Sequence, residues 1–110
     1  MKAKTRRRYL ALKIDSKEKI SQKELMNAVW DAVLRLYGEY GASKTSLALI
    51  RYDAEKNLAI IRVAHTETEK IRAAVATITE IASKPAATHI LTVSGTIKKL
   101  CKKLESNFKP

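Results

Sequence analysis

Two apolar, β-branched runs stand almost back to back in the middle of this chain, and they constrain its fold more than any other feature. Residues 45–53 and residues 57–65 are separated only by Ala54-Glu55-Lys56. Two such runs with a short polar interruption are typical of a β-hairpin. The centre of the chain is therefore predicted to be a pair of antiparallel strands.

A helical pattern stands on each side of this hairpin, and each begins with a capping box. The first box is Ser21-Gln22-Lys23-Glu24, and Gly38 and Gly41 are expected to end its helix. The apolar stripe of this helix is predicted at Leu25, Val29, Val33, Leu36 and Tyr37, widened by Met26 and Trp30. The second box is Thr66-Glu67-Thr68-Glu69, and its helix is expected to stop before Pro85. That helix is predicted to carry Ile71, Val75, Ile78 and Ile81.

Strand patterns at residues 8–14 and 87–94 complete the order β-α-β-β-α-β, and a further helix follows. This order predicts an α/β sandwich of the ferredoxin-like or RRM-like type, with an antiparallel four-stranded sheet and an added C-terminal helix. We expect one domain over residues 1–110, with a basic arm at 1–8 and a basic helix at about 95–108. In the usual sheet order, the last strand lies antiparallel to the first, so the arm and this helix become neighbours.

Charge is concentrated at the two ends of the chain. Of a net charge of +11, the arm contributes +5 and residues 95–110 contribute +4, while the middle is nearly neutral. On a helical wheel, one stripe is apolar and the opposite side is cationic. The stripe is Ile97, Leu100, Cys101 and Leu104, and the cationic side is Lys98, Lys99, Lys102 and Lys103. Together with Arg6, Arg7 and Arg8, these lysines predict a patch for a polyanionic partner, most simply RNA.

The start of the C-terminal helix differs from the starts of the other two. Ser94-Gly95-Thr96 opens it without an acid, and Lys98 and Lys99 lie near its positive end. A phosphate at the open amides would offset this arrangement. A plain cap by Ser94 or Thr96 explains the residues equally well, and the two interpretations are compatible.

No active site is predicted. Cys101 is the single cysteine and sits on an apolar stripe, which favours a structural thiol in a reducing compartment. His65 and His89 are isolated, and three glycines in total leave no glycine-rich phosphate loop, so neither a metal nor a cofactor is expected. The chain has no secretory signal and no apolar run of membrane-spanning length, so a cytoplasmic protein without a membrane partner is expected.

The sheet is expected to differ from that of a base-stacking RNA reader. Such readers place aromatic side chains on their two central strands. Here Tyr9 lies on the first strand, but residues 57–65 contain no Phe, Tyr or Trp. The hairpin strands are also apolar on both faces, so a second face must be buried by the C-terminal helix, a second copy of the chain or another protein.

Four segments of the chain resemble the archaeal ribonuclease P protein component 2 family, which is shared with eukaryotic ribonuclease P and MRP. They are Arg8-Tyr9-Leu10, Tyr52-Asp53, Ile60-Ile61-Arg62-Val63 and Val93-Ser94-Gly95-Thr96-Ile97-Lys98-Lys99. The resemblance spans nearly the whole chain, and Ser-Gly-Thr-Ile-Lys is its most distinctive part. It implies an RRM-like subunit of the ribonucleoprotein endoribonuclease that removes 5′ leaders from precursor transfer RNA.

The resemblance also implies partners and a division of labour. The RNA subunit is catalytic in this family, so the chain would bind and support ribonuclease P RNA without catalytic residues of its own. A TIM-barrel protein component is the implied protein partner, and two copies of the chain could meet as a homodimer within a heterotetramer. Three alternatives stay open: another RNA-binding protein such as a ribosomal protein, a protein-interaction domain, and a small phosphatase-like enzyme. The last would need a glycine-containing anion loop, which Asp15-Ser16-Lys17-Glu18 does not supply.

Overall fold

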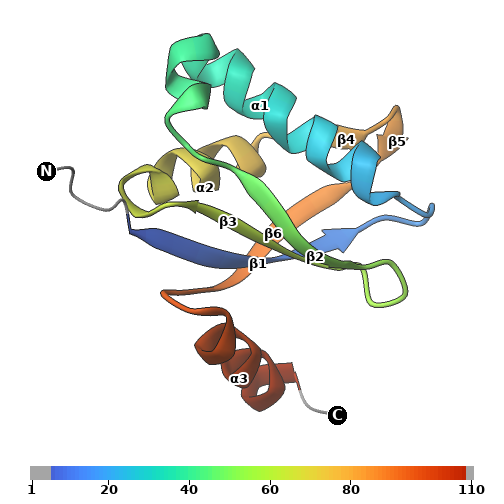
Figure 1. The fold of residues 1–110 in the computed structure, drawn as a ribbon. Helices are drawn as coiled ribbons and strands as arrows, with labels where there is room; N and C mark the ends of the chain where they lie inside the picture. The colour runs from blue at the N-terminus through green and yellow to red at the C-terminus, as the bar shows by residue number, and fades with distance from the viewer. Residues whose placement is uncertain (1–5, 109–110) are drawn as a thin grey trace, which may run out of the picture.

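A four-stranded antiparallel sheet forms the middle layer of the protein, in the order β2-β3-β1-β6 (Figure 1). The computed structural model describes residues 6–108, with side chains described as far as Leu104. The strands are β1 (Arg7–Asp15), β2 (Ala48–Asp53), β3 (Leu58–Ala64) and β6 (Ala87–Ser94). The α-helices are α1 (Gln22–Ser43), α2 (Thr68–Ala76) and α3 (Ile97–Phe108). The predicted ferredoxin-like or RRM-like order with an added C-terminal helix is confirmed.

The two faces of the sheet are covered by different helices. Figure 1 shows α1 and α2 on one face and α3 on the other. Leu10, Leu12 and Ile14 of β1 are fully buried in the larger core, under α1 and α2. Ala11, between them in sequence, belongs to a second cluster with Ile60 and Leu100. Because successive strand residues point to opposite faces, β1 contributes to both cores. The prediction that the second face needs a cover is confirmed, and α3 supplies one.

The first helix begins as its capping box predicts. The Ser21 hydroxyl accepts a hydrogen bond from the Glu24 N–H at 3.1 Å, and the Glu24 carboxylate accepts one from the Ser21 N–H at 2.9 Å. Leu25, Val29 and Val33 are fully buried against the sheet. The reciprocal bonds satisfy two amides at the open helix end, and this fixes where α1 starts.

The predicted end of α1 is confirmed in part, because the regular helix breaks at Gly38 but the chain does not leave the helical conformation at Gly41. Gly38 interrupts the helix with φ 73° and ψ 177°, but helical structure resumes and continues to Ser43. Leu36, before the break, is 45% exposed and lies off the buried stripe on which it was predicted. Thr45 is buried and its hydroxyl donates to the Ala42 carbonyl at 2.8 Å, so β2 starts only at Ala48.

The second predicted capping box is wrong. Thr66 lies in a short 3₁₀ helix, η1 (His65–Glu67), and Glu67 precedes α2 without a capping bond. The Glu67 carboxylate instead accepts a hydrogen bond from the Lys70 ammonium at 3.0 Å. The helix therefore begins at Thr68, whose hydroxyl donates to the His65 carbonyl at 3.0 Å.

Helix α2 is shorter than predicted because its last apolar residues belong to another element. It ends at Ala76, while Ile78 and Ile81 reach the core from the segment that follows. There β4 (Glu80–Ile81) pairs with β5 (Lys84–Pro85) in a small hairpin that the sequence pattern did not indicate. The turn residues Ala82 and Ser83 both have positive φ, at 52° and 67°. A tight turn of this kind normally carries Asn-Gly or Asp-Gly, so its usual signal is missing here.

Candidate nucleic-acid interface

The start of β1 and the end of β6 lie side by side. Tyr9 is paired with Ser94 in the antiparallel register. The Arg8 side chain, half-buried, crosses to the junction with α3: its Nη1 lies 2.7 Å from the position that a Cβ on Gly95 would occupy. The fold therefore brings the N-terminal arginines and the start of α3 together, as the topology predicts.

The first described residue of the arm is attached to the residue that follows β3. The Arg6 carbonyl accepts a hydrogen bond from the His65 N–H at 2.9 Å, and the His65 Nδ1 lies 3.4 Å from the same oxygen. The side chains of Arg6 and Arg7 are exposed. The remaining predicted arm residues, Lys2 and Lys4, lie outside the described residues.

Helix α3 separates apolar from cationic side chains as predicted. Leu100 is completely buried, and Cys101 and Leu104 pack partly buried against the same cluster. The lysines of the opposite side are all exposed: Lys98, Lys99, Lys102 and Lys103. Lys103 also donates a hydrogen bond to the Val93 carbonyl at 3.0 Å, which ties the helix to β6.

A side-chain cap closes part of the α3 N-terminus. The Thr96 hydroxyl accepts a hydrogen bond from the Lys99 N–H at 3.1 Å, so the capping interpretation is confirmed for Thr96. Ser94 is only 6% exposed, so its hydroxyl offers little surface to a ligand. No acid lies in the first turn of α3. Binding of a phosphate at the other amides stays a prediction.

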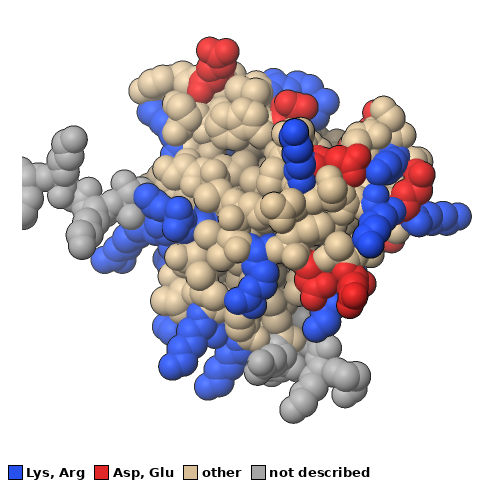
Figure 2. Space-filling view, turned by 45° about the vertical axis from the view of Figure 1, so that its right-hand side comes forward, with Lys and Arg blue, Asp and Glu red and all other residues tan. Residues whose placement is uncertain are grey.

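One side of the molecule carries Lys and Arg side chains without acids among them, whereas elsewhere Lys and Arg stand among acids (Figure 2). In Figure 2, Lys and Arg side chains cluster where the N-terminal trace leaves the fold and below it, whereas the acids lie toward the opposite side and the top. The ion pairs found among residues 6–104 are Lys70–Glu67, Arg72–Glu69 and Lys84–Glu24. None involves Arg6, Arg7, Arg8 or a lysine of α3, so these cations keep their charge available for a partner. We call these arginines and the four α3 lysines the basic patch.

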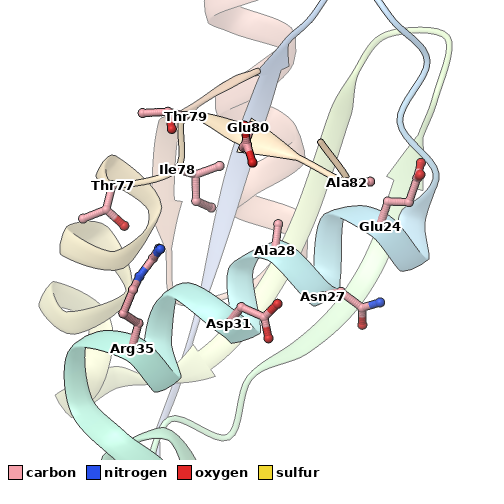
Figure 3. Close-up of a pocket in the computed structure, with 10 residues that line it drawn as sticks. All are labelled: Glu24, Asn27, Ala28, Asp31, Arg35, Thr77, Ile78, Thr79, Glu80 and Ala82. Atoms are coloured by element: carbon pink, nitrogen blue, oxygen red, sulfur yellow. The ribbon is translucent and has the colours of Figure 1, made fainter. Parts of the chain in front are cut away.

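A hollow of about 350 Å³ lies on the other side of the sheet, between α1 and the segment 77–82 (Figure 3). Figure 3 shows Arg35 extending from α1 toward Thr77 and Ile78. Glu24, at the edge of the hollow, is already engaged by the Ser21 N–H and by the Lys84 ammonium, at 3.3 Å. These two contacts, the Ser21 bond first, hold the pKa of Glu24 below its usual value. The carboxylate thus serves the helix cap rather than acid–base chemistry.

Among residues 6–108, no three His, Cys, Asp or Glu side chains gather into a group that could hold a metal ion. Over the same residues, no helix is both long enough and apolar enough to cross a membrane.

Arg62 and Arg51 are cationic residues of the sheet that the sequence patterns did not single out. Arg62 lies in the middle of β3 and is half-buried, whereas Arg51 lies on the edge strand β2 and is exposed. The available signal was a charge inside the apolar run Ile60-Ile61-Arg62-Val63. Such a residue has to point away from the larger core.

The sequence matches known proteins over almost its full length. A model of the Rpp14/Pop5 family matches residues 8–105. Ribonuclease P protein component 2 of Pyrococcus furiosus is 33% identical over 103 residues, which cover 94% of this chain and 86% of that protein. The same component of Methanosarcina barkeri is 36% identical over 107 residues, covering 96% of this chain and 78% of that protein.

The fold also matches a solved structure. A chain in the cryo-EM structure of yeast ribonuclease MRP superposes with a TM-score of 0.70, covering 99% of this chain and 98% of that one. The two sequences are 20% identical, so this likeness concerns the fold alone.

Proposed function

This chain belongs to the Rpp14/Pop5 family, and we propose that it is a protein subunit of ribonuclease P, which binds and supports the RNA that removes 5′ leaders from precursor transfer RNA. The archaeal relatives that carry the name ribonuclease P protein component 2 support this assignment. In this proposal the chemistry belongs to the RNA. The chain contributes binding and positioning.

The observation that carries the proposal is the packing of Arg8 against Gly95. It joins two basic segments from opposite ends of the sequence into the basic patch. RNA carries a phosphate at every nucleotide, and a surface of Lys and Arg binds it largely through release of condensed counterions. Contacts to phosphates position an RNA without reading its sequence. A structural subunit requires this kind of binding.

We assign the RNA contacts to both segments of the patch and to the junction between them. The arginine forks suit bidentate contacts to phosphate, while the lysines act as point charges. The junction contributes backbone amides rather than the buried Ser94 hydroxyl. The proposed contact residues are Arg6, Arg7, Arg8, Ser94, Gly95, Thr96, Lys98, Lys99, Lys102 and Lys103.

Protein partners are part of the same proposal. We infer contact with a TIM-barrel protein component, and pairing of two copies within a heterotetramer, in a cytoplasmic complex. Trp30, Leu36 and Tyr40 of α1 are 38%, 45% and 75% exposed, so these apolar side chains are accessible to a protein partner.

Reconstitution tests the function. Ribonuclease P RNA is assembled with its protein subunits, with and without this chain, and cleavage of precursor transfer RNA is followed. The proposal expects faster cleavage at the 5′ leader junction when the chain is included. Equal rates with and without the chain would contradict it.

Charge-matched variants test the site. Replacing Lys98, Lys99, Lys102 and Lys103 with Gln should reduce the salt dependence of RNA binding, because each lost phosphate contact lowers the slope of log K against log salt by about 0.7–0.9. The matched control replaces Lys17, Lys19, Lys23 and Lys56, which are exposed at the opposite end of β1. Both variants lose the same charge. An equal slope in the two variants would remove the lysine face from the site.

A further inference from the structure

Arg62 lies on the face of the sheet that α3 only partly covers. In the register, Arg62 is paired with Tyr9 of β1 on one side and with Ala48 of β2 on the other. Its neighbour two residues earlier, Ile60, packs in the cluster with Leu100 of α3. Because residues two apart in a strand share a face, Arg62 also points to the α3 side.

The Arg62 guanidinium is poorly satisfied by the protein. Its Nε is buried and has no hydrogen-bond partner among the described atoms. None of the ion pairs found there includes Arg62. An arginine stays protonated in proteins, so this position holds a charge whose buried donor has no partner. Such a group destabilises the free protein unless a ligand supplies the acceptor.

Two more arginines stand in line with Arg62. Arg7 of β1 is paired with Ala64, two residues further along β3. On β2, a bulge sets both Ile50 and Arg51 opposite Ile60, and Tyr52 turns back to the larger core. Arg51 thus lies on the α3 side as well. We call Arg7, Arg62 and Arg51 the arginine row. Neighbouring members of the row lie on adjacent strands and are offset by two residues along the strand, which separates their Cα atoms by about 8 Å.

The row is open to a partner. Helix α3 packs chiefly on β6 and β1, which leaves the half of the face formed by β3 and β2 beside it. Arg7 and Arg51 are exposed and Arg62 is half-buried. The carboxylate of Asp53, further along β2, is engaged within its own turn and not with an arginine of the row. It accepts hydrogen bonds from the N–H groups of Glu55 and Lys56, at 3.1 and 3.2 Å.

We propose that Arg7, Arg62 and Arg51 bind successive backbone phosphates of an RNA strand that runs diagonally across the open half of the sheet, as a continuation of the basic patch. The inference rests on the proposed RNA-binding function and extends it to a second surface. Arg7 belongs to both surfaces, so the strand leaves the patch without a gap in positive charge. A planar fork matches phosphate oxygens bidentately. The half-buried Arg62 side chain turns outward on binding, and its Nε then gains the acceptor that the protein does not supply. Binding here requires no base stacking, in keeping with the lack of aromatic residues on β3.

The test compares two double variants that lose the same charge. Arg51→Gln with Arg62→Gln removes two of the three arginines, and Arg35→Gln with Arg72→Gln removes two exposed arginines of the helices on the other face. The probe is a ribonuclease P RNA transcript, and its affinity is measured across a salt series. The slope of log K against log salt should fall by about 1.4–1.8 in the first variant and change little in the second. Equal slopes in the two variants would overturn the proposal.

Further readouts separate this proposal from the proposed function. If the unaltered chain does not bind the transcript, the proposed RNA-binding function and the proposed phosphate contacts of Arg7, Arg62 and Arg51 both fail. If the unaltered chain binds and only the variant of the four α3 lysines loses affinity, the phosphate contacts of the three arginines fail and the proposed function stands. Loss of a co-purifying protein subunit with unchanged RNA affinity would assign the row to a protein partner and overturn the proposal. Thermal unfolding should show no loss of stability on replacing Arg62 with Met, which keeps an apolar stem. Arg51→Gln alone, at an exposed position, should lower the slope by about 0.7–0.9 even if Arg62 variants fold poorly.

Discussion

The Arg8 guanidinium rests against Gly95, with its Nη1 2.7 Å from the point where a Cβ would stand. A side chain at residue 95 would therefore compete with Arg8 for the same space. The contact links the first strand of the chain to the turn before its last helix. The basic patch thus depends on a glycine as well as on cations.

Gly95→Ala should displace Arg8 while leaving the fold intact. The obstacle is the far end of a flexible side chain, so we expect the free energy of unfolding to change by less than about 1 kcal/mol. RNA affinity should fall, and Gly95→Ala should add little to the loss caused by Arg8→Gln, because both changes act through one contact. Fully additive losses of affinity in a double-mutant cycle would contradict the coupling.

Leu100→Ala should loosen α3 from the sheet. Leu100 is completely buried against Ala11 and Ile60, so its truncation should lower the free energy of unfolding by about 2–5 kcal/mol. RNA affinity should fall as well, since the lysines are positioned through this helix. Lys102→Ala is the control for stability, because it alters an exposed residue of the same helix. An unchanged denaturation midpoint for Leu100→Ala would show that α3 does not depend on this contact.

Gly38→Ala should destabilise the protein through its backbone alone. Nothing lies within 4 Å of an added Cβ at this position, but φ 73° with ψ 177° is a region that only glycine adopts readily. We expect a loss of about 1–3 kcal/mol in the free energy of unfolding. Glu39→Ala, at the next exposed position, serves as control in the same chemical denaturation series. Equal stability of the two variants would argue against the break in α1.

Stability should fall in acid partly because of Glu24. The Ser21 N–H and the Lys84 ammonium hold the pKa of this carboxyl below its usual value of 4.5, so the charged form stabilises the folded state. That contribution is present above the unfolded pKa and is lost as the pH falls through the folded one. The free energy of unfolding should therefore decline below about pH 4.5 less steeply in Glu24→Gln, which keeps a capping acceptor, than in the parent chain. A parallel decline in both proteins would contradict this role.

Much of the fold was predictable from local patterns, and the failures have physical causes. Alternation in residues 8–14 and the box at Ser21 specified their elements because the period of the apolar residues and the local hydrogen bonds act within each segment. The box at Thr66 failed because His65–Glu67 form a 3₁₀ helix and the Glu69 carboxylate faces Arg72, at 3.6 Å, so α2 starts at Thr68. The hairpin at Ala82 and Ser83 was missed because its positive φ values fall on residues without the usual turn chemistry.

The candidate site divides in a similar way. The basic patch followed from charge counts and strand order, because antiparallel pairing of the outer strands determines which ends meet. The arginine row on the sheet could not be predicted in this way, because it depends on the pairing register and on the bulge at Ile50 and Arg51. Neither feature has a signal in the spacing of residues along the chain.

The identity of the bound RNA tests the central claim most directly. The endogenous chain is recovered from cells of its source, and the RNA that accompanies it is sequenced, beside a variant with Lys98, Lys99, Lys102 and Lys103 changed to Gln. We predict enrichment of ribonuclease P RNA with the unaltered chain and a clear loss of that RNA with the variant. Recovery of ribosomal RNA in place of ribonuclease P RNA would contradict the account.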